Sequence, residues 1–180
     1  MGQLLGILGS GIEVEITDLI WHCLRQSSES IAKSDPAHSQ MLEGLVDLAD
    51  ARKPSVLKCR LDEYRSAHPH SHYANLAAAA IALADSRLND AFGLLNSVYS
   101  KCPRNITALY ALGHCCERLG READAIAFYQ DCLKFKKYLQ FPRQRLAAIY
   151  FKNGQIEKTI TEYQFLAAEY PDDLTILLML

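Results

Sequence analysis

The sequence predicts an all-α fold built from repeated pairs of antiparallel helices. The first observation behind this prediction is that Pro69, Pro103 and Pro171 lie 34 and 68 residues apart, which leaves Lys137 in the one empty slot of a 34-residue frame. The second is that each 34-residue unit has apolar residues at helical spacing on both sides of a glycine or polar break. Periods of roughly 20–50 residues are typical of repeat architectures.

The unit at residues 106–139 has the clearest pattern. Each of its two predicted helices has one apolar stripe, and Gly120 separates the helices. Gly113 is small, as expected where two helices approach closely. In the other three complete units a proline follows the second helix. It ends that helix, because proline cannot continue the hydrogen-bond ladder. The stripe residues of this unit are Leu109, Leu112, Gly113, Cys116, Ala125, Tyr129 and Cys132.

The same pattern divides the region 38–180 into four units and the start of a fifth. We expect Asp172 and Asp173 to cap the helix that opens the fifth unit. The apolar end of this helix favours continuation into a longer array, or docking against a partner or a second copy. The units are residues 38–71, 72–105, 106–139, 140–173 and 174–180.

The N-terminal region is predicted to contain an arm and a leading helix. Residues 1–11 are apolar and glycine-rich, and we expect a flexible or partner-dependent arm there. Residues 12–34 have apolar residues at helical spacing, which predicts a helix before the repeats. The run from Leu4 to Leu8 is too short to cross a bilayer, and no basic residue precedes it as in a secretory signal. We therefore expect a cytoplasmic protein without membrane insertion.

The run L-G-x-x-C…A-x-x-x-Y of residues 112–129, with its echoes at 34-residue intervals, resembles the tetratricopeptide repeat. The resemblance covers about residues 38–180. It implies a right-handed superhelical solenoid of antiparallel helix pairs, here with an extra N-terminal helix. The sequence departs from the motif at Cys116 and Ala82, where the family usually has an aromatic residue, and at Lys137, which replaces proline.

The resemblance also implies a binding surface, because in this family the first helix of each pair lines a concave groove that holds a peptide or a helix. We therefore expect a non-catalytic scaffold, adaptor or chaperone-like module with a protein or peptide partner. Aromatic residues in such a row suit apolar anchors of the partner. The candidate groove residues are Tyr73, Leu76, Tyr110, His114, Glu117, Arg118, Phe141, Gln144, Phe151 and Lys152.

Two segments contain residue types that can bind metals or act as nucleophiles. In GHCCERLG (residues 113–120), adjacent helical side chains diverge by about 100°, so His114, Cys115 and Cys116 cannot bind one metal together. We expect both cysteines to be buried and His114 to face the groove. In HPHSH (residues 68–72), the histidines could bind a metal, but they also fit a connection between two units. We expect no metal site, no cofactor and no catalytic site.

Composition narrows the classes of partner. The chain has 19 basic and 21 acidic residues and a net charge of −2, so it lacks the basic surplus of a nucleic-acid-binding protein. An alternative function is that of a self-assembling structural subunit, which would form a homo-oligomer through the apolar arm and the last helix.

Overall fold

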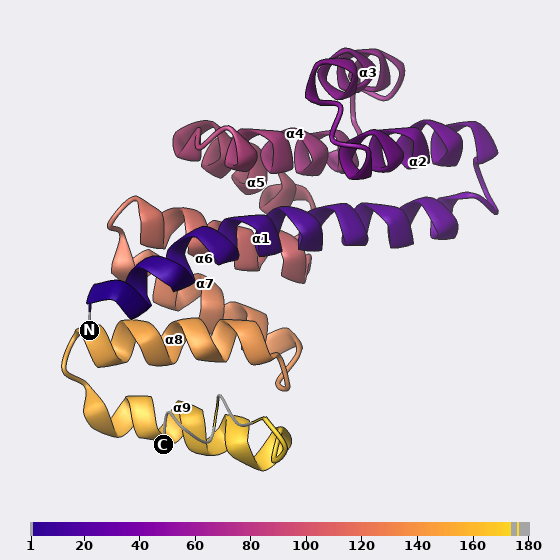
Figure 1. The fold of residues 1–180 in the computed structure, drawn as a ribbon. Helices are drawn as coiled ribbons and strands as arrows, with labels where there is room; N and C mark the ends of the chain where they lie inside the picture. The colour runs from indigo at the N-terminus through magenta and orange to yellow at the C-terminus, as the bar shows by residue number, and fades with distance from the viewer. Residues whose placement is uncertain (1, 174–175, 177–180) are drawn as a thin grey trace. The chain divides into compact units, whose positions relative to one another are not determined.

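The computed structural model describes the backbone of residues 2–173 and 176, and the side chains of residues 16–173 and 176. This part of the chain forms helices only, which confirms the predicted all-α fold (Figure 1). The helices are α1 (Gly2–Ile31), α2 (Pro36–Asp50), α3 (Pro54–Ala67), α4 (His72–Ala84), α5 (Leu88–Lys101), α6 (Ile106–Arg118), α7 (Glu122–Phe135), α8 (Gln140–Lys152) and α9 (Ile156–Glu169).

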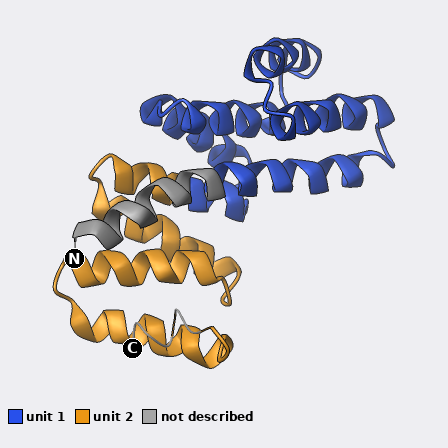
Figure 2. Ribbon diagram, in the orientation of Figure 1, with its two compact units in different colours: residues 1–111 blue, residues 112–180 orange. Residues whose placement is uncertain are grey.

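Helices α2 to α9 follow one another as pairs. The helices α4, α6 and α8 begin at His72, Ile106 and Gln140, each 34 residues after the last. The chain divides into two compact units, residues 1–111 and 112–180, which we describe separately (Figure 2). The boundary falls inside α6. None of the described helices is both long and apolar enough to cross a membrane.

The four turns inside the pairs share one backbone conformation. The second residue after each first helix has a positive φ angle, at Arg52 (51°), Ser86 (57°), Gly120 (74°) and Gly154 (69°). These four positions also lie 34 residues apart. A positive φ is the left-handed conformation that commonly ends a helix, and it suits glycine best because a Cβ atom is crowded there. Only two of the four units have a glycine at this position.

Hydrogen bonds show why all four turns close in the same way. In the α6–α7 turn, the amide of Gly120 donates to the carbonyl of Glu117 (3.1 Å) and that of Arg121 to the carbonyl of Cys116 (2.8 Å). The same pair of bonds recurs at the three other turns. This is the Schellman pattern, which satisfies carbonyl groups that the end of a helix leaves free.

In the first unit, the leading helix is part of the packed core. Helix α1 lies against both α2 and α4 (Figure 1). Its residues Ile16, Ile20 and Leu24 are at most 1% exposed, and their i, i+4 spacing places them on one face. On α4, Ala77 and Ala80 are also buried, so small side chains let other helices approach its backbone closely.

The N-terminus differs from the sequence-based expectation. Helix α1 begins at Gly2, whereas we expected an arm over residues 1–11 and a helix from residue 12. The spacing of Leu4, Leu8 and Ile12 continues the i, i+4 stripe of the buried residues, and this accounts for a helix that extends through the glycines.

In the second unit, α7 packs against α8 and α8 against α9. Ala125 and Tyr129 are buried, as the stripes of residues 106–139 predicted, and so are Leu146, Tyr150 and Leu166. On α9, Ile160 is 41% exposed, whereas the neighbouring Thr159 is buried.

At the end of the chain, the carboxylate of Asp173 accepts a hydrogen bond from the backbone amide of Ile176 (3.4 Å). This contact agrees with the expected helix cap. Residues 174–175 and 177–180 of the expected fifth unit lie outside the described residues.

Candidate functional site: an aromatic surface on helix α8

The candidate groove residues of the first unit lie on a face that the chain itself covers. Leu76, on α4, has no exposed surface, and Tyr73, in the first turn of the same helix, is half-buried. Helices α1, α3 and α5 all pack against α4. Leu76 therefore belongs to the core in this structure, and a partner cannot contact it.

Helix α6 contributes two further candidates that are also buried. Tyr110 and His114 are each 3% exposed. Both ring nitrogens of His114 are buried without a hydrogen-bond partner. Burial, and secondarily the positive charge of Arg145, lowers the pKa of His114 to about 4. His114 is therefore a neutral side chain of the interior at neutral pH, and it is not placed to contact a partner.

Glu117 holds together three helices of the second unit. Its carboxylate accepts hydrogen bonds from both Nε and a terminal nitrogen of Arg145 on α8. It also accepts a hydrogen bond from the hydroxyl of Tyr129 on α7 (3.1 Å). The side chains of Glu117 and Arg145 are only about one fifth exposed, at 21% and 20%. A two-pronged, partly buried ion pair of this kind fixes geometry strongly, whereas the neighbouring Arg118 is exposed.

The accessible candidates gather on α8. Phe141 is 38% exposed and Phe151 is 59% exposed, which is unusual for large aromatic side chains. Gln144, which lies between the two phenylalanines in the sequence, is half-buried, and Lys152 is exposed. Positions 141, 144, 148 and 151 share one helical face because they recur every three or four residues. We call Phe141, Gln144, Phe151 and Lys152 the α8 surface.

Lys152, the charged residue of the α8 surface, is held in place by residues of the turn after α8 and of the preceding helix, α7. The ammonium group of Lys152 pairs with the carboxylate of Glu122 at the start of α7. The side-chain amide of Asn153 donates to the other oxygen of Glu122 (3.0 Å). This pairing raises the pKa of Lys152 and lowers that of Glu122, so both stay charged near neutral pH. The α8 surface therefore combines two exposed rings with a positioned positive charge.

The three buried cysteines are unsuited to nucleophilic chemistry. Cys115, Cys116 and Cys132 have no exposed surface. Burial raises the pKa of Cys115 and of Cys132 to about 12, so the reactive thiolate form is almost absent at neutral pH. Among the described residues, no three His, Cys, Asp or Glu side chains come together as metal ligands.

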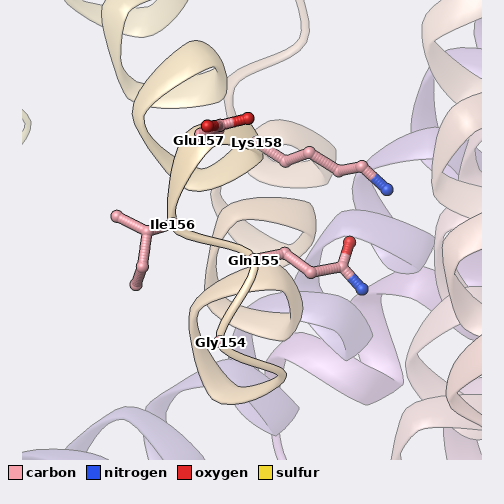
Figure 3. A pocket seen from close by; sticks show the side chains of 5 residues that line it. All are labelled: Gly154, Gln155, Ile156, Glu157 and Lys158. Carbon is pink, nitrogen blue, oxygen red and sulfur yellow. The ribbon is translucent and has the colours of Figure 1, made fainter.

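A shallow depression lies at the turn between α8 and α9. It has a volume of about 420 Å³ and is lined by residues 154–158. Figure 3 shows Gln155 and Lys158 extending to one side of the turn and Ile156 to the other. Ligand sites usually have several polar groups that converge from different elements. This depression is formed by consecutive residues of one turn, so it does not provide such a site.

No family model and no curated protein matches the sequence. Solved structures do match the fold. The crystal structure of MamA has a TM-score of 0.68 at 15% identity, over 84% of this chain and 89% of that one. A tetratricopeptide repeat protein from Parabacteroides merdae has a TM-score of 0.68 at 14% identity, over 93% of this chain and 70% of that one. PilF from Pseudomonas aeruginosa has a TM-score of 0.69 at 13% identity, over 93% of this chain and 82% of that one.

These likenesses define the class of fold. The chain has the all-α fold of tetratricopeptide repeat proteins, as the 34-residue pattern predicted. Identities of 13–15% show a shared fold and nothing more. A role for this chain therefore has to be argued from its own surface.

Proposed function

We propose that this protein is a non-catalytic protein–protein interaction module, acting as a scaffold, adaptor or chaperone-like protein. In this proposal a peptide or helix segment of the partner binds on the α8 surface. The observation that supports this most strongly is the exposure of Phe141 and Phe151 on one face of α8. Exposed aromatic rings are typical anchors in protein interfaces, where they add large apolar area at a small cost in conformational entropy.

The packing of α1 argues against a partner in the first unit. Burial of a large aliphatic side chain contributes about 1.5–3 kcal/mol, and Ile16, Ile20 and Leu24 are all buried. A partner that displaced α1 would have to replace that contribution before gaining any affinity. We therefore treat α1 as a permanent part of the core of the first unit. The proposed binding surface is restricted to α8, with Arg118 as a further exposed candidate.

The buried candidates have another role in this proposal. Leu76, Tyr110 and His114 pack the interior, and Glu117 positions α8 through Arg145. Lys152 fixes the orientation of the partner through its charge. Exposed ion pairs contribute only about 0–1 kcal/mol, so Phe141 and Phe151 should dominate the affinity.

One of the similar structures is itself part of an assembly. The Cut9–Hcn1 hetero-tetramer of the APC/C has a TM-score of 0.63 at 17% identity, over 88% of this chain and 30% of the matched chain. That structure supports an assembly role for this fold, and we extend such a role to this chain as part of the proposal. We also propose a cytoplasmic location, in keeping with the expectation from the sequence.

A pull-down that compares three forms of the full chain tests this function. We expect a partner of the wild-type protein to be lost from the Phe141→Ala/Phe151→Ala variant. Val56→Ala is the matched control, because Val56 is 46% exposed but lies on α3, away from the α8 surface. The control should retain the partner. Equal recovery of the partner by the wild type and the double variant would refute the assignment.

The alternative is self-assembly through the N-terminal arm and the last helix. The side chains of residues 2–15 and most of residues 174–180 lie outside the described residues, so this alternative remains a proposal from the sequence. Light scattering on Leu4→Asp and Leu178→Asp variants tests it, because an assembled wild type should lose mass in at least one of them.

A further inference from the structure

The HPHSH segment, which the proposed function does not use, meets the start of α2 in the first unit. His68 follows α3, and His72 begins α4. The ring of His38 on α2 stacks on the ring of His68, with centroids 4.1 Å apart and planes inclined by 17°. The ring of Tyr73 lies 6.2 Å from that of His38. We call His38, His68 and His72 the histidine seam, and it borders a shallow depression of about 390 Å³.

A chain of polar contacts links the seam to three helices. Nε2 of His38 lies 2.6 Å from the hydroxyl of Tyr64 on α3, and that hydroxyl lies 3.0 Å from Oγ of Ser71, just before α4. Tyr64 is fully buried, and burial raises the pKa of its phenol, so the hydroxyl keeps its proton. The contacts therefore join α2 to the α3–α4 connection while His38 is neutral.

Burial and neighbouring charges disfavour the protonated forms of His38 and His72. His38 faces the carboxylate of Asp35, whose Oδ2 lies 3.9 Å from Nδ1 of His38. The side chain of Asp35 is 50% exposed. Burial, and then His68, lowers the pKa of His38 more than Asp35 raises it. Burial, then Lys101 and then His38, lowers the pKa of His72. The phenol groups of Tyr64 and Tyr73 also lie near His38 and add no negative charge.

We propose that the histidine seam is a pH-sensitive joint, which holds α2 to the α3–α4 connection while His38 and His72 are neutral and loosens when these two imidazoles are protonated. A histidine with a lowered pKa in the folded state is protonated more readily after opening. The stabilisation is therefore fully present above the ordinary histidine pKa of about 6.5, and it is lost as the pH falls below that value. This joint acts in the first unit and does not depend on the α8 surface.

Hydrogen exchange of the full chain at pH 7.5 and pH 5.5 tests the joint. After correction for intrinsic exchange, the amide protection of α2 and of the first turns of α4 should fall at pH 5.5. The fall is about tenfold for each unit by which folding lowers the pKa of a seam histidine, where that histidine titrates in this range. Protection in α8 should change much less.

Two variants identify the residue responsible. His38→Gln removes the titrating ring but keeps a polar group, so the local loss of protection at pH 5.5 should be smaller than in the wild type. His70→Gln is the matched control, because His70 is exposed in the same segment and lies outside the stack. It should behave like the wild type. Protection that depends equally on pH in His38→Gln and the wild type would overturn the proposal.

The wild type alone provides a second readout, in case His38→Gln folds poorly. A proton NMR titration of the His38 ring should have its midpoint below pH 6.5, because the folded state favours the neutral ring. A midpoint at or above pH 6.5 would contradict the proposed joint, whatever the behaviour of the variants.

Discussion

At the residue scale, Gly113 sets how closely α6 can approach α7. A Cβ atom added at Gly113 would lie 2.5 Å from Cε1 of the buried Tyr129 ring. The hydroxyl of that ring is also held by Glu117, so the ring cannot simply rotate away. The pair forms one rigid contact, in which a missing side chain on α6 makes room for a large one on α7.

The substitution Gly113→Ala should therefore destabilise the protein, although alanine is the better helix former. Overpacking of this kind costs about 1–3 kcal/mol in the free energy of unfolding, measured by urea denaturation. Gly93→Ala is the matched control, since a Cβ atom there meets nothing within 4 Å. It should gain about 0.5–1 kcal/mol. An equal gain at both positions would show that the Gly113 contact is not tight.

His114 should make the folding free energy depend on pH. Because its pKa is lowered to about 4 in the folded state, its full stabilising contribution is present above pH 6.5 and is lost between pH 6.5 and 4. A shift of this size corresponds to about 3 kcal/mol. His114→Leu fills the same space without a titrating group, so its unfolding free energy should fall less over this range. Parallel pH profiles of the two proteins would contradict the assignment.

Residue identities predicted part of the site. Cys115 and Cys116 are buried as expected from their place on the helix. His114 was expected in the groove but is buried, because helical spacing gives the direction of a side chain and not what lies opposite it. The contact between His38 and His68 was not foreseen, since it joins residues far apart in the sequence. The only signal in the sequence for this contact was the presence of histidines in both segments, at His38 and in HPHSH.

At the element scale, the four turns inside the pairs follow one design with unequal chemistry. Gly120 and Gly154 adopt a positive φ without a steric cost, whereas Arg52 and Ser86 adopt it with a Cβ atom present. The sequence predicted a break at each turn from glycine or from clusters of polar residues. It could not predict the positive φ at Arg52 and Ser86, because neither residue type favours that conformation.

The substitution Ser86→Gly should stabilise the protein. Relief of the crowded conformation contributes about 1–2 kcal/mol, and the greater freedom of glycine in the unfolded chain offsets about half of it. We expect a net gain of roughly 0.5–1 kcal/mol in urea denaturation. Ser100→Gly, at an exposed position within α5, is the control and should lose about 0.5 kcal/mol. A loss at both positions would show that position 86 carries no strain.

At the scale of the whole molecule, the repeat pattern determined the fold but not which part of its surface is open. The 34-residue period follows from packing that every unit repeats, so it is visible in one sequence. The position of α1 against α2 and α4 is a contact between a leading helix and later elements, and no local pattern encodes its partner. Two of the ten candidate groove residues, Tyr73 and Leu76, were therefore assigned to α4, a helix against which α1 packs.

In the proposed function, α8 presents the binding surface. Site-specific photo-crosslinking tests it directly, with a photoreactive phenylalanine analogue placed at position 151 or position 56 of the full chain. We predict that the partner crosslinks efficiently from Phe151, which is 59% exposed on α8, and not from Val56, which is 46% exposed on α3. Crosslinking from position 56 without crosslinking from position 151 would show that α8 does not present the binding surface.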